Sequence, residues 1–350
     1  MTGSSFGKAF NITTFGESHG RAIGVIIQGC PPGIALTSDI IQIELDKRKP
    51  GSGIASSKRK EPDKAVITSG VFNNHTTGTP LMIMIENQDA DSKAYSENST
   101  LFRPGHGDIT YYAKYGIRDF RGGGRSSARE TAARVAAGAV ALHILKKYDI
   151  TIDTYTVELG GIKVKEFDGR TSMLNSLQCP DLKAFELMEH RINEIKREGD
   201  SLGGVVKIIV TNAPAGLGEP VFDKLDADIA KALMSIGAVK AVEIGAGCYA
   251  ARLKGSENND QISNSGFQTN NSGGILAGIS NGDDIIANAF IKPIPSILKP
   301  LQTIDEHGNE VKITTKGRHD ISAIPRINPV CKAMMALTIT DHLLRQGLNQ

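Results

Sequence analysis

The sequence has no tryptophan, and aromatic residues occupy only 5% of its 350 positions. Proteins that bind single-stranded nucleic acid stack bases on aromatic side chains, so this composition leaves little material for such a surface. An excess of one charge is also missing, because 40 Lys and Arg face 38 Asp and Glu, for a net charge of +2. The chain as a whole is therefore not a polyelectrolyte binder, and any basic cluster indicates a local anionic partner.

Cysteines are few and far apart, and they form no C-x-x-C pair: Cys30, Cys179, Cys248 and Cys331. No signal peptide is apparent, so we expect reduced thiols and a cytoplasmic protein. Long apolar runs are absent too, since none approaches the roughly 20 residues that span a bilayer. With 40% hydrophobic residues, the chain is expected to be soluble and globular, with no membrane partner.

Strand-like and helix-like patterns are intermixed along the chain without strict β-α-β alternation, which favours an α+β fold in one domain over residues 1–350. Strands are expected over residues 6–14, 22–27, 65–71, 81–86, 151–159, 205–210, 239–244, 275–279 and 285–291. Helices are expected from residue 37 or 38 to Pro50, over 182–198 and 223–234, and from Asn328-Pro329 onward. The strand over 81–86 reads as buried on both faces, and Asn281-Gly282 reads as a hairpin turn.

A loop of three consecutive glycines, residues 122–124, is the most distinctive stretch of the chain. Such a loop lets the backbone approach a ligand closely. Ser126 or Ser127 can cap a following helix, and Ser127 and Glu130 have the spacing of a capping box. We therefore expect a helix to begin here and to point its free backbone N–H groups at a ligand.

Five arginines surround this loop, whereas only Asp119 and Glu130 are close enough in sequence to pair with them. They are Arg118, Arg121, Arg125, Arg129 and Arg134. Guanidinium groups beside a helix start form an anion-binding arrangement, so the stretch predicts a site for phosphates or carboxylates. A solvated, salt-bridged helix start is the simpler alternative.

Several common motifs are present only in part. Residues 3–7 and 278–282 fit G-x-S-x-G, but neither has the strand-to-helix setting of a hydrolase nucleophile. Residues 245–250 imitate a dinucleotide-binding loop without the packed helix that should follow. There is no phosphate-binding P-loop and no paired Cys/His set, so no metal site is expected.

Two histidines lie in glycine-rich turns, where a core histidine would be badly placed. His19 belongs to Gly-Glu-Ser-His-Gly and His106 to Pro-Gly-His-Gly-Asp. Asp320 ends the segment Arg318-His319-Asp320, ahead of Arg326. Histidines that titrate near neutral pH, arginines and a carboxylate are the groups needed to move protons on an anionic substrate.

Taken together, these motifs resemble the chorismate synthase family over essentially the whole chain. Residues 16–20 look like its N-terminal signature, residues 124–135 like its central one, and residues 318–320 like the start of the third. The resemblance implies anti-1,4 elimination of phosphate from 5-enolpyruvylshikimate 3-phosphate, which gives chorismate, the last common step of aromatic amino-acid biosynthesis. It also implies a requirement for reduced FMN without net redox change, a β-α-β sandwich fold and a homotetramer.

The resemblance assigns roles to individual residues. His106 would protonate or steady the reduced flavin, His19 would protonate the leaving phosphate, and Asp320 would assist deprotonation at the flavin N5. Ser18 and Ser127 would support them with hydrogen bonds. FMN would be held by Arg125, Ser126, Ser127, Gly237, Ala238, Ala277, Lys292, Pro293, Ile294, Pro295, Ser296 and Arg318. The substrate's phosphate and carboxylates would be bound by Arg48, Arg129, Arg134 and Arg326.

The chain departs from the usual family pattern at a few positions. Ile321-Ser322 replaces Pro-Cys, Gly107 replaces alanine, Ile54 replaces arginine, and Lys332 falls where an acidic residue is common. None of these changes removes a proposed catalytic group, although Ile54 weakens any ligand-clamping role for its loop. We hypothesise that activity survives with altered flavin affinity.

Two other function classes stay open from the sequence. An RNA- or polyanion-binding protein would use the basic runs 47–49 and 58–60, and its affinity would fall steeply with salt. A flavin reductase would turn over NADPH. The sequence does not decide whether the protein reduces its own flavin or depends on another reductase.

Overall fold

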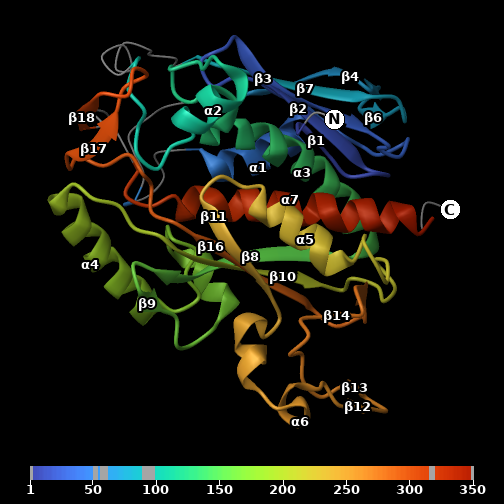
Figure 1. The fold of residues 1–350 in the computed structure, drawn as a ribbon. Coiled ribbons are helices and arrows are strands. Elements are labelled where there is room, and N and C mark those ends of the chain that lie inside the picture. Colours follow the sequence, from blue (N-terminus) through green and yellow to red (C-terminus); the bar gives the residue numbers. More distant parts are fainter. Residues whose placement is uncertain (1–2, 50–53, 56–61, 89–98, 315–319, 348–350) are drawn as a thin grey trace.

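The computed structural model describes residues 3–49, 54–55, 62–88, 99–314 and 320–347. Two five-stranded antiparallel sheets lie on either side of a helical layer, as Figure 1 shows. The upper sheet has the order β1 (Ser5–Phe6), β2 (Asn11–Gly16), β3 (Ala22–Gln28), β7 (Leu81–Glu86), β4 (Ala65–Ser69). The lower sheet has the order β11 (Val239–Ile244), β16 (Ile285–Ile291), β10 (Gly204–Thr211), β8 (Thr151–Leu159), β9 (Ile162–Lys163). The predicted α+β sandwich is confirmed.

Three helices form most of the middle layer, and they are α1 (Ser38–Arg48), α3 (Thr131–Leu145) and α7 (Ile324–Arg345). Helix α3 is apolar on all sides and therefore buried, with α7 packed against one flank. Small residues allow this close approach, because a Cβ atom on Gly138 would lie 2.4 Å from the Cβ of Ala333. One continuous hydrophobic cluster includes residues of both sheets and of this layer.

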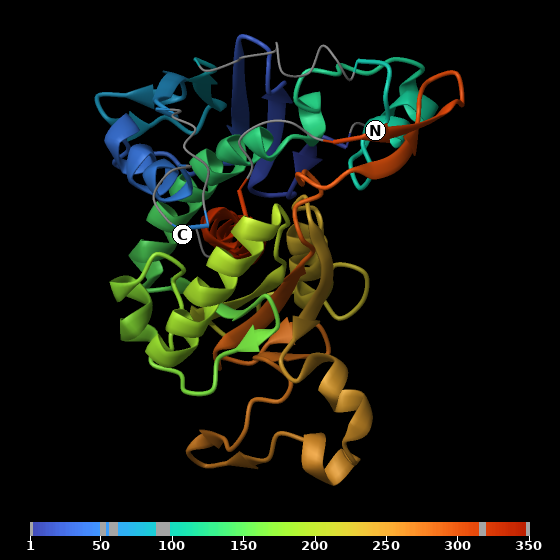
Figure 2. The same ribbon diagram turned by 90° about the vertical axis from the view of Figure 1, so that its left-hand side faces the viewer.

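The remaining elements lie outside this layer. Helix α5 (Leu225–Met234) packs on α7 and β11, and the other helices are α2 (Asp108–Tyr115), α4 (Leu182–Glu198) and α6 (Gly255–Asn258). Four two-stranded ribbons pair β5 (Val71–Phe72) with β6 (His75–Thr76), β12 (Ile262–Ser263) with β13 (Gly266–Phe267), β14 (Ile275–Leu276) with β15 (Ile279–Ser280), and β17 (Leu301–Ile304) with β18 (Glu310–Ile313). In Figure 2 the segment with α6, β12 and β13 projects below the body.

Most of the expected elements are present, and the differences have local causes. Residues 6–14 form two strands, because the chain turns between β1 and β2. Strand β7 alternates between buried and partly exposed residues, so the prediction of burial on both faces was wrong. The hairpin turn lies at Ala277-Gly278 and not at Asn281-Gly282, since Leu276 pairs with Ile279.

Helix α7 begins at Ile324, earlier than predicted, and it contains Pro329 in its interior. Pro325 already occupies the first turn, where a proline needs no hydrogen-bond partner for its nitrogen. The four cysteines are free thiols, and burial raises the pKa of Cys331 to about 12. Among the described residues, no helix is both long and apolar enough to cross a bilayer.

Candidate active site

The glycine loop lies directly against His19. All three glycines of residues 122–124 have positive φ angles, of 67°, 89° and 54°. A Cβ atom on Gly122 would lie 2.2 Å from the Cε1 atom of His19, so only glycine leaves room for this imidazole. The neighbouring Ser18 has its Oγ atom 3.1 Å from Nδ1 of His19, and its N–H donates to the carbonyl of Gly124 at 3.4 Å.

His106 occupies the loop that leads into α2. Its Nδ1 atom lies 3.1 Å from the carbonyl oxygen of Pro104, and its Nε2 atom lies 2.9 Å from Oγ of Ser296. A carbonyl can only accept, so Nδ1 carries the proton and Nε2 accepts from the serine hydroxyl. Burial first, and then the charge of Arg103, lower the pKa of His106 to about 4. The imidazole is therefore neutral at physiological pH.

The loop over residues 292–296 joins this histidine to the lower sheet. Nζ of Lys292 donates to the carbonyl of Gly105 at 2.9 Å, and its backbone N–H donates to the carbonyl of Ala238 at 2.9 Å. A Cβ atom on Gly105 would lie 2.7 Å from the Cβ of Pro295. The two loops are thus in direct contact.

The His106 loop also reaches the glycine loop, and so connects the two histidines. A Cβ atom on Gly107 would lie 3.7 Å from Oγ of Ser126. That distance is an ordinary van der Waals contact, so the alanine usual in the family would fit at position 107 as well. His19 therefore lies against the glycine loop, and the loop of His106 contacts Ser126, which follows the three glycines.

A cavity of about 510 Å³ opens beside His106. Its walls come from the His106 loop, α2 and the ribbon of β17 and β18: Phe102, Arg103, Pro104, Gly105, His106, Ile109, Gln302, Thr303, Ile304 and Glu310. This volume is within the range of about 300–1,000 Å³ typical of small-molecule sites.

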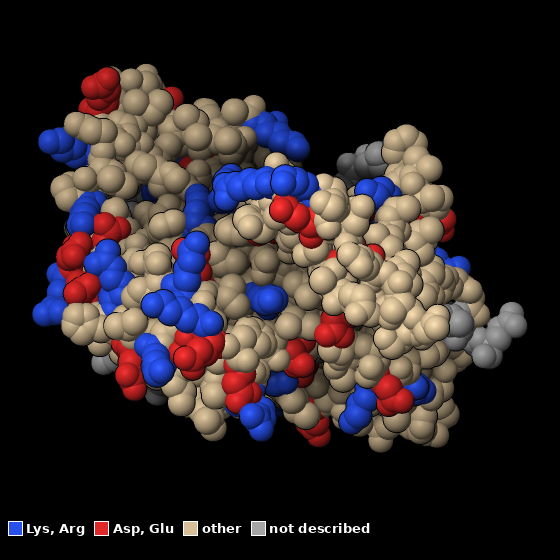
Figure 3. All heavy atoms as spheres, turned by 90° about the horizontal axis from the view of Figure 1, so that it is seen from below, with Lys and Arg blue, Asp and Glu red and all other residues tan. Residues whose placement is uncertain are grey.

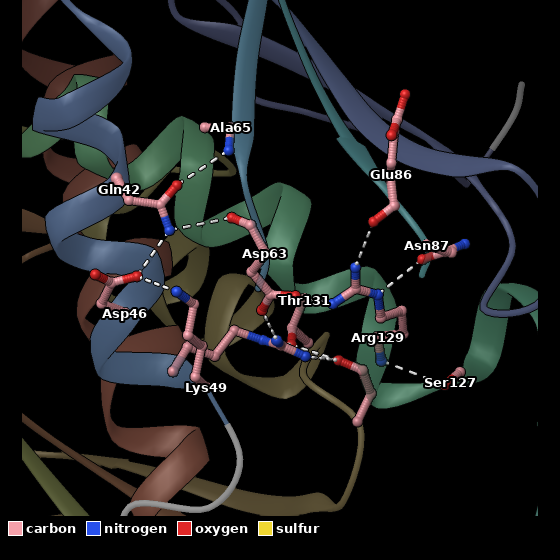
Figure 4. Close-up of polar contacts among 12 residues, drawn as sticks. Gln42, Asp46, Lys49, Asp63, Ala65, Glu86, Asn87, Ser127, Arg129 and Thr131 are labelled. Carbon is pink, nitrogen blue, oxygen red and sulfur yellow. Dashed lines mark hydrogen bonds and ion pairs between the residues drawn. The ribbon is translucent and has the colours of Figure 1, made fainter. Parts of the chain in front are cut away.

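Arg48 and Arg129 meet inside the protein at Asp63. Asp63 and Arg129 of this cluster are labelled in Figure 4. Nη1 of Arg48 lies 2.8 Å from one carboxylate oxygen of Asp63, and Arg129 pairs with the other. The exposed fractions of the three side chains are 1%, 5% and 0%. Burial, with Arg326 nearby, lowers the pKa of Arg48 to about 9, so this arginine stays charged at neutral pH. The cluster carries a net charge of about +1.

The other arginines of the central stretch also have protein partners. Arg134 pairs with Glu130 at 2.8 Å, Arg121 with Asp119 at 2.8 Å, and Arg118 with Asp108 at 3.8 Å. Arg125 donates to the carbonyl of Gly16 at 3.1 Å and to Oγ1 of Thr14 at 2.7 Å. The prediction that only two carboxylates could pair with these arginines was wrong, because Asp63 and Asp108 come from more distant segments.

The predicted capping box does not form. Ser127 caps a short 3₁₀ turn by accepting from the N–H of Arg129 at 3.3 Å, and α3 begins only at Thr131. The carboxylate of Glu130 is engaged elsewhere, since it accepts from Oγ1 of Thr14 at 2.8 Å as well as from Arg134. The contact of Glu130 with Thr14 of β2 therefore forms in place of the local capping hydrogen bond.

Asp320 pairs with Arg326 at 2.9 Å, and its side chain is 9% exposed. Two of the family departures stabilise this region. The N–H of Ile321 donates to the carbonyl of Ala55 at 2.8 Å, a bond that proline could not make. Ser322 is buried and accepts from the N–H of Ile324 at 3.4 Å at the start of α7. Arg318 and His319 lie outside the described residues.

One predicted flavin ligand lies apart from the others. Ala277 forms the turn between β14 and β15, beside the start of α5, where Leu225 N–H donates to the carbonyl of Gly278. Gly237 and Ala238 follow the other end of α5, and Lys292 follows the far end of β16. Strand β16 is seven residues long, so its two ends lie roughly 20 Å apart. The structure does not bring Ala277 to the histidines within one chain.

Four residues of this site were not predicted, and they are Asp63, Asn87, Arg103 and Asp108. Nε of Arg103 lies 2.7 Å from Asp108 and its Nη2 2.8 Å, so a buried two-point ion pair braces the His106 loop. The motif Arg103-Pro104-Gly105-His106-Gly107-Asp108 contains both partners and could have indicated this pair. Asp63 and Asn87 give no comparable signal in the sequence.

Comparisons with known proteins identify the family of this chain. Residues 10–344 match the model of the chorismate synthase family. The chorismate synthase of Desulfosudis oleivorans is 61% identical, over 99% of this chain and 98% of its own, and that of Desulfatibacillum aliphaticivorans is 58% identical, over 99% and 97%. A solved structure titled "Crystal Structure of Chorismate Synthase" superposes with a TM-score of 0.77 at 32% identity, covering 97% of this chain and 93% of that one. The chain belongs to the chorismate synthase family.

Proposed function

We propose that the protein eliminates phosphate from 5-enolpyruvylshikimate 3-phosphate in the anti-1,4 sense, with reduced FMN as cofactor and chorismate as product. Membership of the family makes it a carbon–oxygen lyase that acts on phosphates in the shikimate pathway. The observation that carries the proposed mechanism is the contact of His19 with Gly122 and of the His106 loop with Ser126, with a serine hydroxyl at each imidazole ring.

The residues beside His106 suit a flavin phosphate and ring. Ser126 and Ser296 offer hydroxyl groups, Lys292 offers a cation, and the neighbouring cavity is of ligand size. The chain of contacts from Lys292 to Ala238 adds backbone groups to the same wall. When bound, reduced FMN would lend an electron to the substrate and recover it, so that no net oxidation results.

His106 would act from its neutral form. Its Nε2 atom is an acceptor in the structure, and an anion placed beside it would raise its pKa by favouring the protonated ring. The residue can therefore hold a proton at Nε2 when an anionic cofactor is bound and release it when the cofactor leaves. Arg103 and Lys292 oppose this protonation, which limits it to the loaded site.

His19 would give its proton to the leaving phosphate. The hydroxyl of Ser18 holds the ring through a hydrogen bond at Nδ1. Arg121 first, and His19 more weakly, lower the pKa of the Asp119 carboxyl, so His19 and Asp119 lie close enough for their charges to interact. Proton transfer of this kind typically contributes about 10²–10⁴-fold to a rate.

The four arginines proposed to bind the substrate would act in two ways, depending on how exposed their side chains are. Arg134 and Arg326 are partly accessible, at 18% and 24%, and can reach carboxylates or phosphate directly. Arg48 and Arg129 are buried at Asp63, so they would act mainly through the positive field of their cluster. Asp320, paired with Arg326, would be the carboxylate that assists proton removal.

We also propose a single-domain cytoplasmic protein that assembles as a homotetramer, as the family resemblance implies. One hydrophobic cluster spans both sheets, which supports a single domain. Large apolar side chains such as Phe222 and Met173 are 94% and 82% exposed, which supports burial in an assembly. Light scattering of the purified protein tests this, since a monomer would contradict it.

Binding to a nucleic acid is less well supported. Arginines of the central stretch are paired with carboxylates, and in Figure 3 basic side chains alternate with acidic ones on the left and centre of the face. A reductase activity with NADPH would be a second, separate activity. It is tested by mixing the protein with oxidised FMN and NADPH under anaerobic conditions and following reduction of the flavin.

The elimination itself is tested by mixing protein, photoreduced FMN and 5-enolpyruvylshikimate 3-phosphate without oxygen. We expect phosphate and chorismate in equal amounts, and neither product with oxidised FMN. Absence of chorismate with fully reduced flavin would overturn the proposal.

A further inference from the structure

Asn87, at the end of β7, makes a set of hydrogen bonds that no other residue of the site makes. Its Nδ2 atom donates to the carbonyls of Glu17 at 3.0 Å and Gly20 at 2.8 Å. Its Oδ1 atom accepts from Nε of Arg129 at 2.9 Å, as Figure 4 shows, and its backbone N–H donates to Arg21 at 3.1 Å. One side chain thus contacts two functional segments.

The two carbonyls are the ends of the turn that carries Ser18 and His19. That turn is closed by the N–H of Gly20, which donates to the carbonyl of Glu17 at 3.1 Å. Because a carbonyl only accepts and a guanidinium only donates, the partners of Asn87 fix the orientation of its amide group. Aspartate could keep the bond to Arg129 but not the bonds to the turn, and alanine could keep neither.

The contact with Arg129 extends further. Nη2 of Arg129 donates to the carbonyl of Glu86 at 3.3 Å, and Nη1 pairs with Asp63, which also holds Arg48. The His19 turn is therefore linked through one amide to the buried arginine cluster. This amide is a direct contact between the turn that carries His19 and that cluster.

We propose that Asn87 is a positioning residue, which holds the His19 turn in register with the Arg129 cluster so that proton donor and positive field act on one substrate. The inference deepens the proposed function and rests on it. Misplacement of a reacting group by about 1 Å can cost on the order of 10²-fold in rate. Loss of the amide should therefore affect turnover far more than stability.

The test compares Asn87→Ala and Asn87→Asp with a matched control, Asn175→Asp. Asn175 also donates its amide to two carbonyls of a turn, those of Thr171 and Cys179, at 2.9 and 2.8 Å. It lies in the segment before α4 and touches none of the site residues. The control therefore reports the cost of losing such a turn amide alone.

We expect both Asn87 variants to lose about 10²-fold in kcat/KM for chorismate formation, while the control keeps wild-type activity. The His19 ring signals, assigned in NMR spectra with His19→Ala, should shift in the Asn87 variants and not in the control. Using alanine as well as aspartate separates the effect of the added charge from the loss of positioning.

Wild-type kcat/KM and unchanged His19 signals in both Asn87 variants would overturn the inference. An equal loss of activity in the Asn175 control would overturn it too, because the effect would then be general to turn amides. The NMR measurement needs no turnover, so it stands apart from the proposed function. If the wild-type protein makes no chorismate, the proposed function is wrong. If the His19 ring signals are unchanged in the Asn87 variants, the positioning role of Asn87 is wrong.

Discussion

Nε2 of His106 and Oγ of Ser296 lie 2.9 Å apart, although 190 positions separate the two residues in the chain. The histidine leads into α2 above the helical layer, whereas the serine follows β16 of the lower sheet. The candidate flavin site thus depends on both sheets of the sandwich. It also means that Nε2 of the neutral His106 accepts its hydrogen bond from a residue that follows the lower sheet.

Replacing Ser296 by alanine removes the hydroxyl that donates to His106. One hydrogen bond contributes about 1 kcal/mol, so we expect affinity for reduced FMN to fall about fivefold. Anaerobic fluorescence or absorbance titration measures this. Ser265→Ala, in the projecting segment, is the control, and an unchanged affinity in Ser296→Ala would contradict the assigned contact.

The pKa of His106 is open to direct measurement by NMR. In the protein without ligand the ring should stay neutral from pH 7 to about 5 and titrate near its pKa of about 4. Arg103→Gln removes a positive charge beside the ring and leaves Asp108 with only its longer ion pair to Arg118, and both changes raise the pKa of His106. A value near 4 in a folded Arg103→Gln variant would refute this account, and Lys292→Gln should shift it less in the same direction.

The same shift affects stability at low pH. An unfolded histidine takes up its proton near pH 6.5, before the folded His106 does near 4. The unfolded state therefore binds more protons in this interval, so His106 lowers stability progressively as the pH falls from about 6.5 to 4. Urea unfolding across this range should show a smaller loss in His106→Gln than in the wild type.

Gly122→Ala should abolish most of the activity without unfolding the protein. The added methyl group would occupy the position of the His19 ring, and loss of a general acid typically costs about 10²–10⁴-fold. Gly161→Ala is the matched control, because Gly161 also has a positive φ, of 86°, but has no atom within 4 Å of an added Cβ. Equal activity of the two variants would show that His19 does not need this space.

Asp63→Asn tests the buried arginine cluster. The substitution leaves Arg48 and Arg129 buried without a carboxylate, and breaking a buried pair in this way costs about 3–5 kcal/mol. Asp168→Asn, whose partner Arg170 is exposed, should cost far less, because ion pairs on the surface contribute little to stability. Urea denaturation compares the two, and similar losses would contradict the role given to Asp63.

Local patterns predicted much of the fold. The amphipathic period of residues 182–198 and the alternation of 151–159 match α4 and β8 residue for residue, because each element buries one face of its own. The turn at Ala277 and the start of α7 were misplaced, since tertiary pairing overrode the Asn-Gly and Asn-Pro signals.

The sequence predicted which residues form the candidate site, but it did not predict the contacts among them. His19, His106 and Ser126 stand out as polar groups among glycines, and the structure gathers them at one loop. The partners Asp63 and Asn87 could not be predicted, because their contacts with Arg129 join segments 66 and 42 positions apart. The spacing of residues in the sequence does not predict such long-range contacts.

His19, which lies against the glycine loop, and His106, in the loop before α2, are proposed to perform the proton transfers of a flavin-dependent elimination. The most direct measurement follows chorismate formation in a single anaerobic turnover with photoreduced FMN, for the wild type, His19→Ala and His106→Ala. The account predicts that each variant forms chorismate at least about 10²-fold more slowly than the wild type. Wild-type rates in both variants would contradict it.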